Sequence, residues 1–120
     1  MILVVEDEPV TRNVLVWALN QSGYTVLAAE DGAQALAISR ARRSDVFGVL
    51  ITDIYLPGMS GIELAAELRR DRPELRIIYV SGMSQERFAT LGAGMTRSIF
   101  LAKPFDARQL AGALRALSEL

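Results

Sequence analysis

The chain has no cysteine and no histidine among its 120 residues. The lack of cysteine excludes disulfides and thiolate metal sites, and it is typical of a reducing cytoplasm, where we expect the protein to act. The lack of histidine removes the commonest general base and metal ligand, so hydrolytic triads built on histidine are excluded. Lysine is almost absent as well, since Lys103 is the single lysine and every other basic residue is an arginine.

An excess of charge of either sign is also missing, with 13 basic against 14 acidic residues and a net charge of −1. This balance gives no general attraction to nucleic acid or to an anionic membrane, and we expect neither as a partner. The apolar start at residues 1–5 is too short for a signal peptide, and no apolar run approaches the roughly 18 residues of a membrane span. With 51% hydrophobic residues, the composition predicts a single domain over residues 1–120 with a sizeable core.

Short apolar, β-branched segments alternate with longer segments of helical periodicity. The short segments predict strands at residues 2–5, 25–29, 47–52, 75–80 and 98–102. This alternation is typical of βα units around a parallel sheet, which indicates the α/β class. The segment at 47–52 is an uninterrupted hydrophobic run that ends in Thr52, so we expect it at the centre of the sheet, buried on both faces.

Five helices are expected between and after these strands. The first begins at Pro9 and stops before Gly23, Asp31 caps the second, and Ser60 caps the third. The expected apolar faces are Val10, Val14 and Trp17 in the first helix, Ala33, Leu36 and Ala37 in the second, Leu64, Ala65 and Leu68 in the third, and Leu110, Leu114 and Leu117 in the last.

The fourth helix, somewhere within residues 84–91, is the least well defined. Its apolar face is thin, and Gly92 and Gly94 interrupt the segment that follows. We therefore expect this helix to be mobile.

Chemically active side chains follow four of the five expected strands: Glu6 and Asp7, Asp53, Ser81 and Lys103. Each alone has an ordinary explanation, such as an acidic residue near a helix N-terminus or a polar residue in a turn. Together they are expected to meet, because the carboxyl ends of parallel strands share one edge, where open α/β sheets bind ligands. Clustered carboxylates favour a hard divalent cation, and a lysine with a serine suits a phosphate.

The ordered set of motifs resembles the receiver domains of two-component response regulators over essentially the whole chain. The motifs are Leu3-Val4-Val5-Glu6-Asp7-Glu8-Pro9, Asp31-Gly32 with Ala35-Leu36, Asp53 followed by Leu56-Pro57-Gly58-Met59-Ser60-Gly61, Ser81-Gly82, and Lys103-Pro104-Phe105. The resemblance implies the flavodoxin-like (βα)5 fold, a doubly wound parallel sheet with strand order 2-1-3-4-5. It implies a signalling phosphoacceptor instead of an enzyme.

The resemblance also assigns roles at the phosphoacceptor site. Asp53 would take a phosphoryl group from the phosphohistidine of a sensor histidine kinase or a histidine phosphotransfer protein. Asp7, Asp53 and the backbone carbonyl of Tyr55 would hold Mg²⁺ (or Mn²⁺), with Glu6 in support through water. Lys103 would contact the phosphate, and its bond to Pro104 would be cis, an isomer uncommon enough to be a sharp prediction.

A second set of implied roles concerns signalling. The Ser81 hydroxyl would turn toward the aspartyl phosphate, and Phe100 would follow into the space vacated. This change would bias the face formed by the fourth helix, the last strand and the last helix, which a downstream protein target would read. Phosphorylation could also drive homodimer formation.

Two further positions set the expected lifetime of the phosphoryl group. In receivers, the residues at Tyr55 and Met83 flank the phosphoryl group, and neither is an acid or amide able to orient a water molecule. We therefore expect slow autodephosphorylation. The segment from Ser81-Gly82 to Lys103-Pro104-Phe105 looks particularly like receivers of hybrid sensor kinases, although a free-standing regulator is equally compatible with the chain.

Three other functions are alternatives for this sequence. A flavin site would want a Ser/Thr/Gly-rich phosphate loop after the first strand, where Glu6-Asp7-Glu8 would repel a phosphate. A phosphatase of the haloacid-dehalogenase type expects a second aspartate at the position of Tyr55, together with a cap domain. The third alternative is a receiver-like interaction module that works without phosphorylation, and the presence of Asp53, Asp7, Ser81 and Lys103 argues against it.

Overall fold

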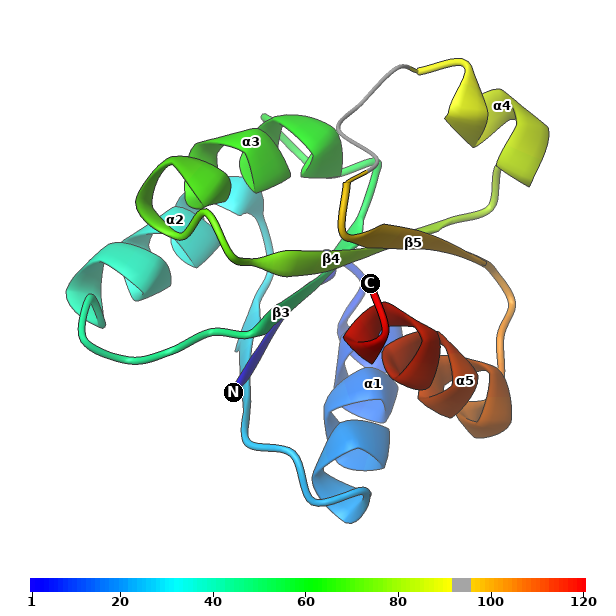
Figure 1. Cartoon of the computed structure of the whole chain (residues 1–120), viewed down its shortest axis with the longest axis horizontal. Helices are drawn as coiled ribbons and strands as arrows, with labels where there is room; N and C mark the ends of the chain where they lie inside the picture. Colours follow the sequence, from blue (N-terminus) through cyan, green and yellow to red (C-terminus); the bar gives the residue numbers. More distant parts are fainter. Residues whose placement is uncertain (92–95) are drawn as a thin grey trace.

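The structure is a computed structural model that describes residues 1–91 and 96–120. Strands and helices alternate along the described chain, as Figure 1 shows. Their bounds are β1 (Ile2–Val5), α1 (Pro9–Gln21), β2 (Val26–Ala29), α2 (Gly32–Ala41), β3 (Val49–Asp53), α3 (Gly61–Asp71), β4 (Arg76–Ser81), α4 (Gln85–Ala89), β5 (Ser98–Ala102) and α5 (Ala107–Ser118).

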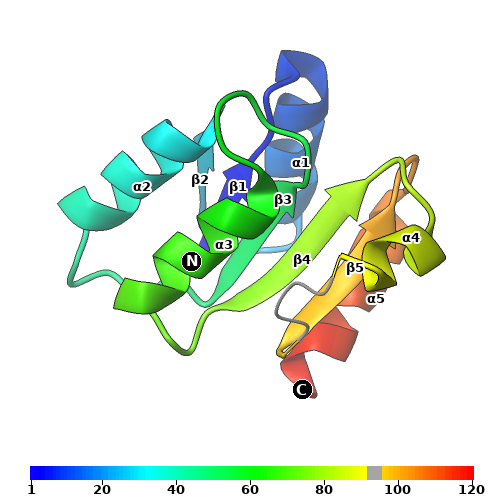
Figure 2. The ribbon, with the colours of Figure 1, turned by 90° about the horizontal axis from the view of Figure 1, so that it is seen from above.

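The strands form one parallel sheet in the order β2-β1-β3-β4-β5, visible side by side in Figure 2. This is the predicted flavodoxin-like order. β3 lies at the centre, and its residues 50–52 are fully buried, which confirms the expectation drawn from its unbroken apolar run. The order reverses between β1 and β3, so the crevice for a ligand lies at the carboxyl ends of these two strands.

Two separate cores cover the two faces of the sheet. Alternate residues of β1 point to opposite faces, so that Leu3 and Val5 join one core while Ile2 and Val4 join the other. The first core is completed by α2, α3 and α4, and the second by α1 and α5. Figure 1 shows these two groups of helices on opposite sides of the strands.

Side-chain caps fix where the helices begin. The Asp31 carboxylate accepts the N–H of Gln34 at the start of α2, and the Ser60 hydroxyl accepts the N–H of Glu63 at the start of α3, both as predicted. Glu63 completes a capping box by accepting the N–H of Ser60. These caps define the loop ends that reach toward the carboxyl edge of the sheet.

The predicted apolar face of the first helix is wrong. Val10, Val14 and Trp17 lie on α1 as expected, but they are 69%, 60% and 65% exposed, while Leu15 and Leu19 are buried against the sheet. The helix carries two apolar stripes of similar spacing, and periodicity alone does not tell which stripe contacts the sheet. The exposed stripe of Val10, Val14 and Trp17 is called the α1 stripe below.

A smaller correction applies to α2, where Ala33 and Ala37 are exposed and Ala35 and Leu36 are buried. Alanine is so small that either helix face tolerates it, which is why its positions predicted the buried side poorly. The faces predicted for α3 and α5 are confirmed, since Leu64, Ala65, Leu68, Leu110, Leu114 and Leu117 are all buried.

The fourth helix is shorter than the predicted segment and covers only Gln85–Ala89. Gly92 and Gly94, on which part of that prediction rested, lie outside the described residues. The third and fourth strands begin later than predicted and end one residue further along the chain, so Asp53 and Ser81 are the last residues of β3 and β4.

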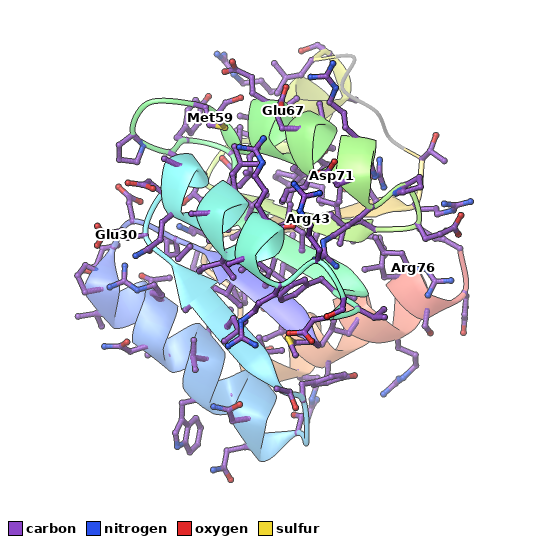
Figure 3. The ribbon with its side chains drawn as sticks, turned by 90° about the vertical axis from the view of Figure 1, so that its left-hand side faces the viewer. Glu30, Arg43, Met59, Glu67, Asp71 and Arg76 are labelled. Atoms are coloured by element: carbon purple, nitrogen blue, oxygen red, sulfur yellow. The ribbon has the colours of Figure 1, made fainter. Side chains whose placement is uncertain are left out.

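Close packing fixes the loop before α3 against α2, on the side of the molecule that faces the viewer in Figure 3. A Cβ added to Gly32 would lie 2.5 Å from the Cγ of Met59, so this position accepts only glycine unless Met59 moves. The loop that carries Met59 also carries the chain from Asp53 to α3, and its position therefore bears on the site.

Candidate functional site

The carboxyl edge of the sheet brings the predicted site residues together. Asp53 and Ser81 end β3 and β4, Glu6 follows β1, and Lys103 follows β5 directly. A backbone hydrogen bond from the N–H of Lys103 to the carbonyl of Ser81 (2.8 Å) continues the pairing of β4 and β5 beyond the last strand residue. Residues far apart in the sequence are thus held by the strands themselves.

Lys103 links two of the carboxylates. Its Nζ lies 2.6 Å from Oε1 of Glu6 and 2.6 Å from Oδ2 of Asp53, and both carboxylates are largely buried. A compact ammonium can donate to two carboxylates in different directions, whereas the planar fork of an arginine favours one partner. The geometry explains why a lysine stands here in a chain otherwise rich in arginine.

A third carboxylate completes the cluster. One oxygen from each of Glu6, Asp7 and Asp53 lies within 4.8 Å of the other two. Hard oxygen donors at this spacing match Mg²⁺ or Mn²⁺, which bind through one or two carboxylates and otherwise keep water. Asp7 is exposed and Glu6 is 2% exposed, so Asp7 offers an open oxygen while Glu6 is already engaged by Lys103 and by the N–H of Glu8.

Burial and charge act in opposite directions on this cluster. Burial raises the pKa of Glu6, although the hydrogen bond from Lys103 works to lower it. Burial alone would lower the pKa of Lys103, but its hydrogen bonds to Asp53 and Glu6 outweigh burial, and the pKa of Lys103 is raised. Lys103 is therefore firmly cationic at neutral pH and available to an anion.

Asp53 is held by its own backbone surroundings. Its Oδ1 accepts the N–H of Tyr55 (3.0 Å), and its carbonyl accepts the hydroxyl of Thr52 (2.9 Å). A Cβ on Gly61 would lie 2.1 Å from the Asp53 carbonyl oxygen, and the Gly61 N–H donates to Ile54 (2.8 Å). The start of α3 is thus packed directly on the backbone of Asp53.

Thr52 and Gly61 had no assigned role in the sequence prediction. Gly61 ends the motif that follows Asp53. Its contact with the Asp53 carbonyl is visible only in the folded structure, because no local sequence pattern shows that the two segments approach so closely. Thr52 is fully buried. The sequence signal that could have pointed to its role is a polar residue in an otherwise apolar strand segment.

The residues predicted to form the switch and to tune dephosphorylation lie around this edge. Ser81 is buried, and its hydroxyl accepts the N–H of Met83 (3.2 Å). Met83 and Phe100 are half-buried and pack on the first core. The Tyr55 side chain, by contrast, is 61% exposed. The peptide bond between Lys103 and Pro104 is cis, the isomer that the resemblance implied.

An apolar groove of about 620 Å³ begins at the site and runs between α1 and α5. Lys103 and Pro104 line one part of it, and the α1 stripe lines another, together with Phe105 and Leu110. Sequence reasoning missed this groove because it placed the α1 stripe in the core.

Comparison with known proteins agrees with this geometry. The family model described as the response regulator receiver domain matches residues 2–115. Among curated proteins, the chain is 36% identical over 118 residues to the sensor kinase CckA of Brucella abortus, covering 98% of this chain and 12% of that protein. It is also 36% identical over 118 residues to the phosphate regulon transcriptional regulatory protein PhoB of Pseudomonas aeruginosa, covering 97% of this chain and 50% of that protein.

Solved structures give the same result. The receiver domain of the hybrid histidine kinase CckA superposes with a TM-score of 0.80 at 31% identity, covering 97% of this chain and 96% of that one. The response regulator TrrA of Thermotoga maritima, solved with Mg²⁺ and a beryllium fluoride, gives 0.78 at 31% identity with the same coverage.

The chain spans about half, or less, of the length of the curated relatives cited above. Within the described ranges, no helix is long and apolar enough to cross a membrane. Family match, fold and site all point the same way. The chain belongs to the response regulator receiver domains, the phosphoaccepting signalling modules of two-component systems.

Proposed function

We propose that Asp53 is the residue that accepts the phosphoryl group, from the phosphohistidine of a sensor histidine kinase or a histidine phosphotransfer protein. The observation that carries this proposal is the double contact of Lys103 Nζ with Asp53 and Glu6. It places a fixed positive charge beside an oxygen of Asp53, where an incoming phosphoryl group would bring negative charge.

The transfer exchanges one bond for another. An oxygen of Asp53 attacks phosphorus, the bond between phosphorus and the histidine nitrogen breaks, and its electron pair returns to the imidazole of the partner. The Asp53 carboxylate has no proton to lose in this step. Lys103 then exchanges its contact with Asp53 for one with a phosphoryl oxygen, while Glu6 keeps the ammonium in place.

The carboxylates of Asp7 and Asp53 would hold Mg²⁺ or Mn²⁺, with the Tyr55 backbone carbonyl as a further ligand and Glu6 acting through water. Such a cation supplies charge neutralisation to the phosphoryl oxygens. The exposed carboxylate of Asp7 and the open edge at which it lies support this assignment.

Phosphorylation would be read through Ser81 and Phe100. The Ser81 hydroxyl can rotate to donate to a phosphoryl oxygen, and Phe100 is the half-buried side chain on the neighbouring strand that would follow. The output face is then the one formed by α4, β5 and α5, which we propose is recognised by a downstream protein target or by a second copy of the chain.

The phosphodonor partner would dock over the α1 stripe. Val10, Val14 and Trp17 expose an apolar surface along the groove that Lys103 also lines, which offers a contact area to a partner that presents phosphohistidine to Asp53. Exposed apolar residues around a Trp are typical of the centre of a protein interface.

The relatives support two settings for the domain. The match to CckA supports a place as the receiver of a hybrid sensor kinase, and the match to PhoB supports one in a response regulator. In both settings residues 1–120 would act as a single receiver domain in the cytoplasm, with catalysis limited to its own phosphoryl transfer and slow autodephosphorylation.

The proposal is tested by incubating the protein with a small-molecule phosphodonor and Mg²⁺ and recording the mass of the intact chain. The expected result is one added phosphoryl group, which is absent in Asp53→Asn and is reduced when a chelator removes Mg²⁺. Unmodified wild-type protein would favour an interaction module that works without phosphorylation. Modification that survives Asp53→Asn would mean a different acceptor.

A further inference from the structure

The attachment of α4 to the sheet depends on one side chain. Of the residues in α4, which are all within the described part of the chain, only Phe88 is buried, at 1% exposure, and the other four are exposed. Figure 2 shows α4 at the β5 end of the sheet. A helix of five residues has little stability of its own, so its position rests on this tertiary contact.

Phe88 is seated between two aromatic rings. Its ring centroid lies 4.9 Å from that of Phe100 with an interplanar angle of 26°, and 5.2 Å from that of Tyr79 with an angle of 46°. Tyr79 and Phe100 are themselves paired residues of β4 and β5. Both ring spacings fall within the range at which aromatic pairs attract each other beyond simple burial.

One of these two rings is the proposed switch residue. Tyr79 is buried and belongs to β4, which has a neighbour on both sides, whereas Phe100 is half-buried and lies on the edge strand β5. We expect a rotation of Phe100 toward Ser81 to break its stacking on Phe88, with Tyr79 as the ring contact that stays. No other buried side chain of α4 could then keep the helix in its present position.

We propose that Phe88 is the positioning residue through which Phe100 controls α4. While Phe100 stacks on Phe88, α4 is held against the sheet; when Phe100 turns inward, Phe88 loses this partner and α4 is released. The inference rests on the proposed phosphorylation at Asp53, and it adds the physical link between the site and the output face.

The coupling between the Phe88–Phe100 stack and ligand binding at Asp53 must act in both directions. If the Phe88–Phe100 stack favours the outward position of Phe100, it must also oppose any ligand at Asp53 that favours the inward position. Weakening the stack should then tighten the binding of a phosphoryl mimic at Asp53, although Phe88 belongs to a different element.

The test compares the wild-type chain with Phe88→Leu, which keeps an apolar side chain but removes the ring. Phe47→Leu is the matched control, because Phe47 is also a buried phenylalanine of the first core but lies before the central strand β3, at the amino ends of the strands. Beryllofluoride with Mg²⁺ serves as the phosphoryl mimic. Backbone amide exchange is followed at Phe88, Thr90 and Leu91, whose N–H groups donate within or just after α4.

In the wild type, beryllofluoride should speed exchange at these three amides at least threefold. In Phe88→Leu, exchange should be fast already without the mimic, and the dissociation constant for beryllofluoride should fall by about twofold to tenfold. Phe47→Leu should change neither quantity. Phe100→Leu removes the other half of the stack at a half-buried position and should reproduce the fast exchange of α4, even if Phe88→Leu folds poorly.

Unchanged exchange of α4 in the wild type, in a sample whose Asp53 and Ser81 amide signals do shift with beryllofluoride, would overturn the inference and leave the proposed function intact. The inference also fails if Phe88→Leu and Phe100→Leu leave α4 exchange as it is in the wild type. Absence of any shift at Asp53 would contradict the proposed function, and the inference with it.

Discussion

Lys103 is the side chain that ties the site together, and its identity matters as much as its charge. Its ammonium reaches Glu6 and Asp53 at once, at 2.6 Å each. The pKa of Glu6 is raised by burial while the pKa of Lys103 is raised by the two carboxylates, so the ammonium stays charged beside Asp53 and can bind a further anion. The planar guanidinium of an arginine at this position would be less suited to contact both carboxylates at once.

Tyr55 has an exposed side chain that is neither an acid nor an amide, so we expect it not to orient a water molecule for attack on the proposed phosphoryl group. Tyr55→Asn supplies an amide two residues after Asp53. We expect it to shorten the phosphoryl half-life severalfold, because the amide can orient a water molecule for attack on phosphorus. The half-life is measured by loss of the added phosphoryl mass with time. Tyr55→Ala and Met83→Ala should not lengthen it, because neither side chain positions the water molecule. A wild-type half-life of only seconds would contradict the expectation of slow autodephosphorylation.

Tyr79 gives a pH dependence away from the site. Burial raises its pKa above the ordinary value of 10.0. Above pH 10.0 an unfolded tyrosine loses its proton while the folded one keeps it, so stability is lost as the pH rises toward the folded pKa. The free energy of unfolding of the wild type should therefore fall more steeply than that of Tyr79→Phe, by up to about 1.4 kcal/mol per pH unit.

Urea denaturation of both proteins between pH 7 and the alkaline range measures this difference. The variant keeps the ring that contacts Phe88, so the two proteins should be similar at neutral pH. Parallel curves above pH 10.0 would contradict the raised pKa.

At the level of whole elements, the start of α3 is the support for Asp53. Gly61→Ala places a methyl group 2.1 Å from the Asp53 carbonyl oxygen, and we expect it to lower the free energy of unfolding by about 2 kcal/mol or more. It should also weaken the binding of Mg²⁺, because Asp53 has to move. Urea denaturation and metal titration measure the two effects.

The control for this substitution is Gly112→Ala in α5. A Cβ there meets nothing within 4 Å, and alanine is the better helix former, so the variant should be about 0.5–1 kcal/mol more stable than the wild type. Equal effects of the two substitutions would contradict the close contact between α3 and Asp53.

The α1 stripe gives a prediction about the partner. Trp17→Ala should lower the rate of phosphoryl transfer from a phosphohistidine partner at least tenfold, because Trp side chains contribute strongly at interfaces. Phosphorylation by a small-molecule donor should be unchanged, since Trp17 lies on the exposed side of α1. Val46→Ala is the control, as Val46 is exposed between α2 and β3. An equal loss with both donors would mean that Trp17 acts on the site itself.

Considered as a whole molecule, the chain shows which features sequence patterns predict and which need the fold. The strand segments, the caps at Asp31 and Ser60 and the edge that gathers Asp53 with Lys103 follow from local rules of periodicity, turn chemistry and parallel pairing. The side of α1 that meets the sheet does not follow, because Leu15 and Trp17 belong to two stripes of equal periodicity.

Contacts between elements are also visible only in the three-dimensional structure. The approach of Gly61 to Asp53 and the stacking of Phe88 on Phe100 join residues whose separation along the chain carries no local signal. A single buried aromatic in a five-residue helix is too little for a periodic pattern. The first contact supports the backbone of Asp53, and the second is the contact that we propose links the site to α4.

The most direct test of the central claim locates the phosphoryl group on the chain. After reaction with a small-molecule phosphodonor and Mg²⁺, reduction with borohydride converts an aspartyl phosphate to homoserine, and peptide mass mapping identifies the residue. Homoserine at position 53 alone, and none after omission of the phosphodonor, is the predicted result. A modified residue at Asp7 or Glu6, or an unmodified chain, would contradict Asp53 as the phosphoacceptor.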